Sequence, residues 1–184
     1  MEIERRLSDV LSEFARTLVT DFPIQAILDH LVVRIVDVLP ISAAGVTLIA
    51  PGSDPHYIAA SDDAAMRLEE LQTELGEGPC LVAYRKGEAV VVPDLRADDR
   101  FPRFSARAIE EGLGAVFTFP LRHDDHQLGA LDLYRTNPGS MNAGAMTAAP
   151  TLADVTAAYL LNAQPRSDLR ESSDRARETA STMR

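Results

Sequence analysis

Apolar residues recur at helical spacing in the first forty residues and predict two helices. The first helix presents a narrow apolar face at intervals of four, three and four residues: Leu7, Leu11, Phe14 and Leu18. Pro23 suits the first turn of a second helix, which reaches Pro40. Its apolar positions are Ile24, Leu28, Leu31, Ile35 and Val38. The narrow first face suits packing on a partner chain or, equally, on the sheet of its own chain.

Short apolar runs bounded by turn residues predict the strands, which are 43–50, 56–61, 89–92, 115–121 and 127–134. The first two form a hairpin across the loop 51–55. The last two are joined at hairpin length by 123–126. Because these last two strands are almost continuously apolar, we expect both of their faces to be covered.

Between the strands the pattern predicts shorter helices. Ser61 and Asp62 suit a helix N-cap, and the helix that follows has its apolar positions at Met66, Leu68, Leu71 and Leu75. After the break at 76–79, a short helix is expected over 80–85, then a loop over 96–104 and a helical turn over 105–112. The last helix lies within 142–162, with Leu152, Val155 and Tyr159 on one face. Pro150 should start or kink this helix.

This order of elements predicts an α+β fold with an antiparallel sheet of about five to six strands. The terminal helices would cover one face of the sheet. The middle helices and loops would form a lid over the other face, with a pocket beneath them. The tail 165–184 carries mostly polar and charged residues and is expected to be a linker, helical or disordered.

Charge and cysteine content narrow the class of protein. The net charge of −10 argues against broad binding of nucleic acids or anionic membranes. Cys80 is the single cysteine, so an intrachain disulfide, a Cys-based zinc site and a CxxC redox pair are all excluded. The acidic start is unlike a signal peptide, and the sequence lacks an apolar run of membrane-spanning length. A cytoplasmic protein is therefore expected.

Several sequence blocks resemble a known family. The stretch 71–80 contains Gly-Glu-Gly-Pro-Cys, and 92–95 and 99–104 form the next block. The segments 119–122 and 128–134 match two central strands. In this order the blocks resemble the GAF domains of actinobacterial GAF-ANTAR regulators. The resemblance implies a GAF/PAS-like fold over residues 5–164.

In those regulators a GAF sensor precedes an ANTAR domain, a three-helix module that binds RNA hairpins and prevents transcription termination. The twenty residues after Gln164 lack the aromatic and Ala-rich core of that module. Direct RNA or DNA binding is therefore not expected from this chain. The chain also departs from the family pattern at Phe101, where Trp is usual, and at Asp132, where Asn is usual.

Asp132 is the leading candidate for a ligand contact, because a carboxylate on a covered strand needs a partner. Either a ligand or a group such as Arg100, Arg103 or a loop N–H would satisfy it. Cys80 suits a redox or chromophore site, or simply a small buried apolar residue. The full set of candidate ligand-binding residues is Cys80, Tyr84, Phe101, Phe104, Thr118, Asp132 and Tyr134.

Catalysis and metal binding have little support in the sequence. The free-methionine sulfoxide reductase of this fold needs paired cysteines, and a Ser/His/Asp set is not evident. His123 and His126 flank Asp124 and Asp125 in a hairpin loop, where solvated turn residues are expected rather than metal ligands. Neither a metal motif nor a nucleotide fingerprint points to a cofactor, so its identity is left unknown.

The sequence thus predicts a non-enzymatic sensory domain, acting in transcription regulation of the antitermination type. It would bind an unidentified small molecule and signal through its terminal helices as a homodimer, away from membranes. The alternative is a dimerisation or scaffold domain whose own side chains fill the pocket. A third hypothesis is antitermination on RNA through a separate output domain.

Overall fold

The computed structural model describes residues 1–17, 23–49 and 56–161, which form an α+β fold. The elements are α1 (Glu2–Thr17), α2 (Ile24–Val38), β1 (Ala43–Leu48), β2 (His56–Ala60), α3 (Asp63–Leu75), α4 (Pro79–Lys86), β3 (Val90–Val92), α5 (Pro102–Glu110), β4 (Ala115–His123), β5 (His126–Arg135) and a helix over 143–161. The predicted fold class is confirmed. The predicted loop 51–55 and tail 165–184 lie outside the described residues.

The five strands form one antiparallel sheet in the order β2-β1-β5-β4-β3. β4 and β5 are joined by a tight turn in which Asp124 takes the left-handed conformation, with φ of 51°. This order places β5 at the centre of the sheet, between β1 and β4. β5 therefore has a hydrogen-bonded neighbour along each edge, and its residues 128–134 are all buried.

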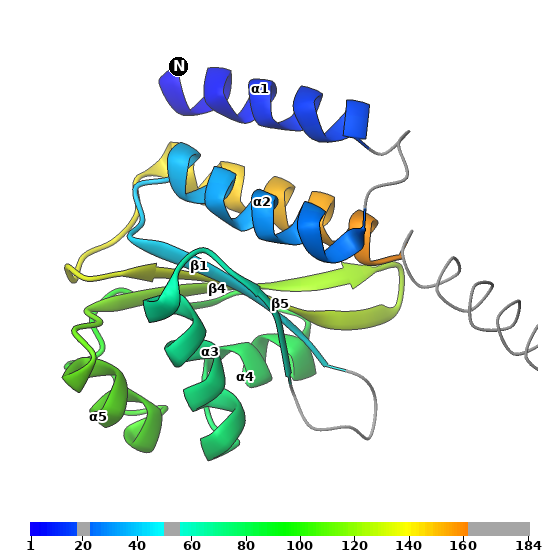
Figure 1. The fold of residues 1–184 in the computed structure, drawn as a ribbon. Helices are drawn as coiled ribbons and strands as arrows, with labels where there is room; N and C mark the ends of the chain where they lie inside the picture. Colours follow the sequence, from blue (N-terminus) through cyan, green and yellow to red (C-terminus); the bar gives the residue numbers. More distant parts are fainter. Residues whose placement is uncertain (18–22, 50–55, 162–184) are drawn as a thin grey trace, which may run out of the picture.

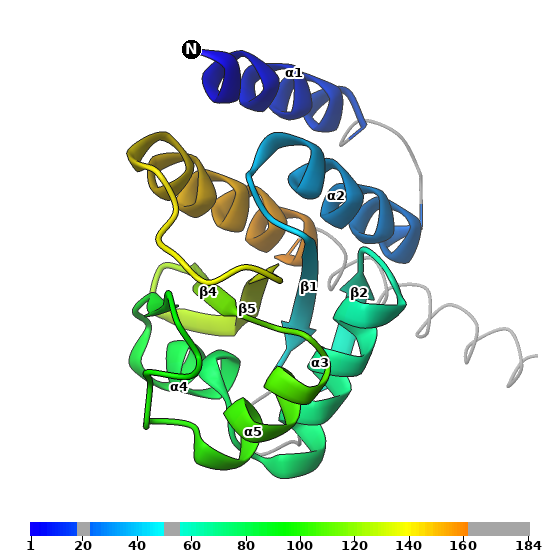
Figure 2. The ribbon, with the colours of Figure 1, turned by 90° about the vertical axis from the view of Figure 1, so that its left-hand side faces the viewer.

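The helices form two layers around the sheet (Figures 1 and 2). α1, α2 and the helix over 143–161 lie on one side, and α3, α4 and α5 lie on the other. Side chains alternate between the two faces along β5. Leu131 and Leu133 join the core under α2, whereas Tyr134 joins the core beneath α3 and α5. The predicted division into terminal and lid helices is therefore correct.

α1 packs on other helices rather than directly on the sheet. Val10 and Phe14 are its buried residues, so the apolar face is centred on them, and Leu11 is only half-buried at its edge. The Phe14 ring meets the edge of Tyr159, whose hydroxyl donates a 2.5 Å hydrogen bond to the Phe14 carbonyl. Of the predicted face, Phe14 is buried and Leu7 packs against the core, whereas Val10 takes the inward place predicted for Leu11. Leu18 lies outside the described residues.

One helix start differs from the prediction, and one of two predicted alternatives is decided. α5 begins at Pro102, inside the predicted loop 96–104, because Glu77 accepts hydrogen bonds from N–H groups of its first turn. That cap comes from a residue distant in sequence, so the local pattern could not reveal it. The last helix lies within the predicted range 142–162 and runs through Pro150, so Pro150 does not start it; the Asn142 side chain caps this helix by accepting from Ala145 N–H at 2.8 Å.

Candidate functional site

A row of residues across the middle of the sheet faces α3 and carries the predicted acidic group. Asp132 on β5 lies opposite Thr118 on β4 and opposite Gly45 on β1. The side chain of Asp132 is fully buried. Its Oδ1 accepts a 2.6 Å hydrogen bond from the Thr118 hydroxyl, and its Oδ2 accepts a 3.2 Å bond from Nε2 of Gln72 on α3. Arg100 and Arg103, suggested as partners, instead pair with Asp98 and Glu77.

A second carboxyl group, that of Glu69, enters the same space from α3. It is fully buried, and it accepts hydrogen bonds from the hydroxyls of Tyr134, at 2.8 Å, and Thr47. It reaches the sheet at Gly45, where a Cβ atom would lie only 2.1 Å from Glu69 Oε1. A single acidic group was expected here, and the structure has two. We refer to these side chains together as the Asp132 cluster: Thr47, Glu69, Gln72, Thr118, Asp132 and Tyr134.

Both carboxyl groups of the cluster hold their protons to higher pH than usual. Burial raises the pKa of Glu69 well above its ordinary value, and the nearby Asp132 raises it further by repulsion and by a hydrogen bond between the two groups. Burial also raises the pKa of Asp132, but hydrogen bonds from Glu69, Thr118 and Gln72 oppose that rise. Of the two groups, Glu69 therefore keeps its proton to the higher pH. Among the described residues, neither carboxyl pairs with Lys, Arg or His.

Gln72 joins the cluster to α4 through both ends of its amide group. Nε2 donates to Asp132 Oδ2 and, at 3.1 Å, to the hydroxyl of Tyr134. Oε1 accepts a 3.0 Å hydrogen bond from the main-chain N–H of Cys80, at the start of α4. A Cβ atom at position 78 would lie 2.3 Å from this oxygen, so only glycine leaves room for the amide.

The Gly-Glu-Gly-Pro-Cys segment supports this geometry residue by residue. Gly76 ends α3 in the left-handed conformation, with φ of 59°. Glu77 caps α5, and Gly78 admits the Gln72 side chain. Pro79 occupies the first turn of α4, where a missing N–H costs nothing. Cys80 presents its N–H to Gln72.

The structure brings part of the predicted ligand-binding set together. Thr118, Asp132 and Tyr134 belong to the Asp132 cluster, and Cys80 meets it through its main chain. Burial and the two carboxyl groups raise the pKa of the Cys80 thiol well above its ordinary value, which keeps the thiol neutral. Phe101 and Phe104 are buried in the same apolar cluster as Tyr134, while the half-buried Tyr84 packs beside Cys80. Their role in binding a ligand stays a prediction.

Sequence reasoning missed Thr47, Glu69 and Gln72. The available signal was spacing, because Glu69 and Gln72 are three residues apart on α3, on the face that buries Ala65 and Leu68. Two polar residues at core positions of one helix face indicate either a buried polar cluster or a ligand.

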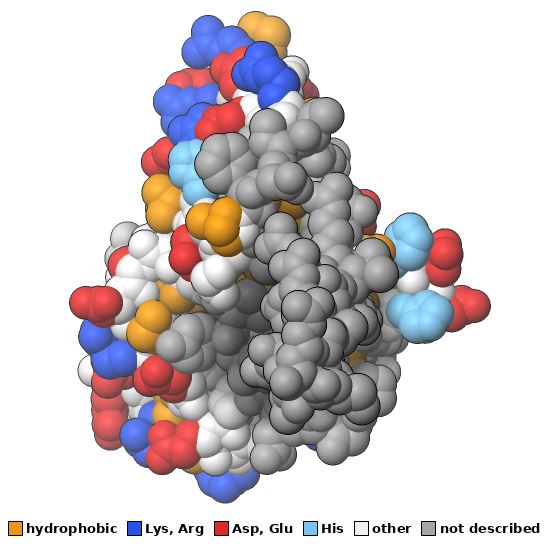
Figure 3. Space-filling model, turned by 45° about the vertical axis from the view of Figure 1, so that its right-hand side comes forward, with side chains coloured by type: hydrophobic (Ala, Val, Ile, Leu, Met, Phe, Trp, Pro, Cys, Tyr) orange, Lys and Arg blue, Asp and Glu red, His pale blue; other side chains and the backbone are white. Residues whose placement is uncertain are grey.

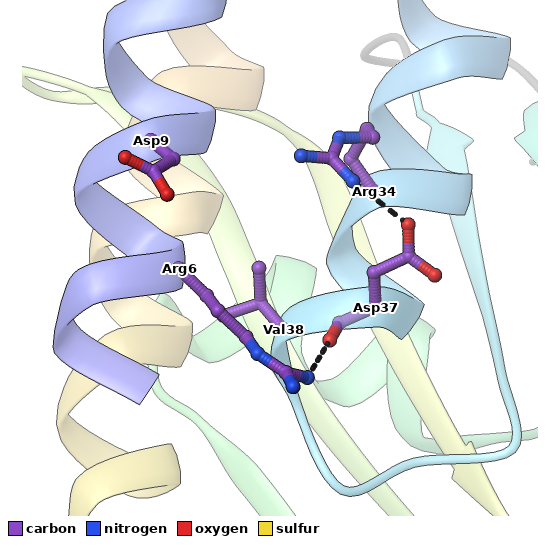
Figure 4. Close-up of a pocket in the computed structure, with 5 residues that line it drawn as sticks. All are labelled: Arg6, Asp9, Arg34, Asp37 and Val38. Carbon is purple, nitrogen blue, oxygen red and sulfur yellow. Dashed lines mark hydrogen bonds and ion pairs between the residues drawn. The ribbon is translucent and has the colours of Figure 1, made fainter. Parts of the chain in front are cut away.

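A separate groove of about 280 Å³ lies between α1 and α2 (Figure 4). Arg6 donates a 3.0 Å hydrogen bond to the main-chain carbonyl of Asp37, and Arg34 donates a 2.9 Å hydrogen bond to the Asp37 carboxylate. Asp9 and Val38 complete the lining. Side chains of both charges also gather over the surface of α1 (Figure 3). This groove lies on the side of the sheet opposite the lid helices, away from the predicted pocket.

Comparison with known families decides the classification. A family model described as GAF domain matches residues 23–160. The chain belongs to the GAF domain family. A comparison of this GAF domain with curated proteins gave no match.

Among the described residues, no group of three or more His, Cys, Asp or Glu side chains is placed to hold a metal ion. No helix in the same part of the chain has both the length and the apolar character needed to cross a bilayer.

Solved structures share the fold at low sequence identity. The GAF domain of a phosphoenolpyruvate-protein phosphotransferase from Coxiella burnetii is 18% identical, with a TM-score of 0.72, and the match covers 91% of this chain and 98% of that one. Free methionine-R-sulfoxide reductase from Neisseria meningitidis, in complex with its substrate, is 18% identical, with a TM-score of 0.68 and coverages of 87% and 91%. The chromophore-binding domain of a bacteriophytochrome from R. palustris is 11% identical, with a TM-score of 0.66 and coverages of 90% and 63%.

Proposed function

We propose that this GAF domain is a non-enzymatic sensor that binds a small molecule at the Asp132 cluster and signals through its terminal helices. The observation that carries the proposal is a pair of fully buried carboxyl groups, Glu69 and Asp132, without a cationic partner among the described residues. Burying two carboxyl groups side by side is expensive, and packing alone does not require it. Strongly perturbed carboxyl groups of this kind are concentrated at functional sites.

Signalling through the terminal helices is supported by the position of β5. The same strand presents Asp132 to the lid helices and Leu131 and Leu133 to the core under α2. A ligand that binds better to one arrangement of β5 would shift the population of that arrangement. The helix over 143–161 lies on this second face and holds α1 through the bond from Tyr159 to Phe14. A change at Asp132 thus has a short packed route to both terminal helices.

The second candidate is a scaffold or dimerisation domain, and one observation favours it. The described side chains already provide hydrogen bonds to both carboxyl groups, so the cluster is complete without a ligand. In that case Asp132 has a purely structural role. Removing it would then leave buried donors without an acceptor, at a cost of about 1–3 kcal/mol.

Melting curves of wild type and Asp132→Ala, each with and without a library of metabolites, separate the two candidates. A sensor should be stabilised by at least one compound, and Asp132→Ala should lose that stabilisation while remaining folded. The matched control is Asp154→Ala, which removes an exposed carboxylate from the last helix. If every compound leaves the wild type unchanged and native mass spectrometry finds no bound molecule, the scaffold function is the better account.

The wider context follows from the sequence resemblance. We place the domain in cytoplasmic transcription regulation of the antitermination type, as a homodimer through the terminal helices. Because of its acidic charge, we do not expect this chain to bind RNA itself. Light scattering at high protein concentration should give the mass of a dimer. A salt-dependent, sequence-selective shift of an RNA hairpin would contradict the expected lack of RNA binding.

A further inference from the structure

The side-chain amide of Gln72 occupies a cradle whose hydrogen-bonding groups are specific for that chemical group. On one side Asp132 Oδ2 and the Tyr134 oxygen accept from Nε2, at 3.2 and 3.1 Å. On the other side the Cys80 N–H donates to Oε1 at 3.0 Å. The cradle thus offers two acceptors and one donor, which is the complement of a primary carboxamide, –CO–NH2.

The walls of the cradle fit the amide closely. Gly78 brings its backbone so near that a Cβ atom there would lie within 2.3–2.8 Å of the Gln72 side chain. Gln72 is fully buried, so its amide exchanges no hydrogen bonds with bulk water. The complementarity is therefore both steric and polar.

We propose that Gln72 is a built-in occupant of a carboxamide cradle, and that the ligands of this domain are small primary carboxamides that displace it. This inference rests on the proposed sensor function and adds the chemical class of the ligand. A carboxylate is a poor substitute, because its oxygen would face the Asp132 carboxylate without a proton to donate. An N,N-dialkyl amide is equally poor, because it has no N–H group for Asp132 or Tyr134.

Displacement of Gln72 also explains how a ligand would act on the lid. The amide links α3 to the Cys80 N–H at the start of α4, so a ligand that replaces the amide takes over that link. A free carboxamide would then hold α4 and β5 without holding α3. The response to the ligand would be a change in the contact between α3 and the sheet.

The test is chemical rescue of Gln72→Ala in the full chain. Acetamide has the same heavy atoms as the four that this substitution removes, and small molecules do enter cavities of this kind. Acetamide should raise the melting temperature of Gln72→Ala by about 3–5 °C for each tenfold increase above its dissociation constant. Acetate and N,N-dimethylacetamide should not. If Gln72→Ala is unfolded without additive, the same titration should recover its folded circular dichroism signal.

Gln72→Met is the matched control, because it fills the same space without an amide and should not respond to acetamide. Equal effects of acetamide on both variants, or none on Gln72→Ala, would overturn the carboxamide proposal. Acetamide, propionamide and benzamide are then tested together with the metabolite library for their effect on the melting temperature of the wild type. A stabilising metabolite that depends on Asp132 but has no primary amide would overturn the ligand class and leave the sensor function standing. Rescue of Gln72→Ala, with no compound of any class stabilising the wild type, would support the cradle and remove the sensor function.

Discussion

Glu69→Gln should make the protein more stable than the wild type at pH values above the ordinary pKa of Glu. In the folded chain the pKa of Glu69 is raised, so this group keeps its proton there while the unfolded chain loses it above about 4.5. The folded state then binds one proton more than the unfolded state. The free energy of unfolding therefore falls with rising pH by up to about 1.4 kcal/mol per unit, and it stops falling above the folded pKa. Glutamine removes this proton and its pH dependence.

The substitution itself should cost little at low pH. Glutamine has the shape of protonated glutamate, and its amide N–H can donate to Asp132 in place of the carboxyl proton. Its oxygen can accept from Tyr134, and the Thr47 hydroxyl can turn to accept instead of donate. We expect a difference within about 1 kcal/mol of wild type near pH 5, growing in favour of Glu69→Gln by up to about 1.4 kcal/mol per pH unit above it.

Urea unfolding at a series of pH values from about 5 to 8 measures both quantities. Glu70→Gln is the control, because it removes an exposed carboxyl from the next position and leaves the Asp132 cluster intact. Its profile should follow the wild type. Parallel profiles for Glu69→Gln and wild type across this range would refute the raised pKa of Glu69 in the folded chain.

Three further substitutions test other parts of the structure. Gly45→Ala should lower the free energy of unfolding by about 1–3 kcal/mol, because the added methyl group would press on the Glu69 side chain. Most of that loss should disappear when Glu69→Ala is also present, and a double-mutant cycle measured by urea unfolding tests this. Glu77→Gln should lower the free energy of unfolding by about 1–2 kcal/mol near neutral pH and by less in acid. The pKa of Glu77 is lowered, because the Phe104 and Arg103 N–H groups outweigh its burial, so this stability is lost as pH falls below about 4.5. Tyr159→Phe should cost about 1 kcal/mol and speed amide hydrogen exchange in α1, whereas unchanged exchange there would mean that the Tyr159 hydroxyl does not hold the helix.

Much of the fold was predictable because the residues that begin and end its helices and strands act on their near neighbours in sequence. Asp62 accepts from the Ala65 N–H at 2.8 Å, as expected of an N-cap, and Gly76 ends the helix about four turns later. The two central strands appear where continuous apolar runs predicted them. Such signals depend only on residues a few positions apart, so one sequence is enough to interpret them.

The candidate site was predictable only in part, because its second half comes from tertiary contacts. Asp132 stands out as a charge in an apolar strand. Glu69 does not, since it lies in a helix with several other acidic residues that face solvent. Only the approach of α3 to Gly45 shows that this one carboxyl is buried. The inward position of Val10 was missed for a related reason, because the partner of α1 is another helix and not the sheet.

The cap on α5 has a consequence for the order of folding. A helix of nine residues is too short to be stable alone in water, and here its first N–H groups depend on Glu77, 26 and 27 residues earlier in the chain. A peptide of this segment should therefore be largely unstructured. In the intact chain, α5 can become stable only after the turn between α3 and α4 has formed. Kinetic measurements should thus find that residues 102–110 gain protection late, together with the closing of a long loop rather than with the early local helices.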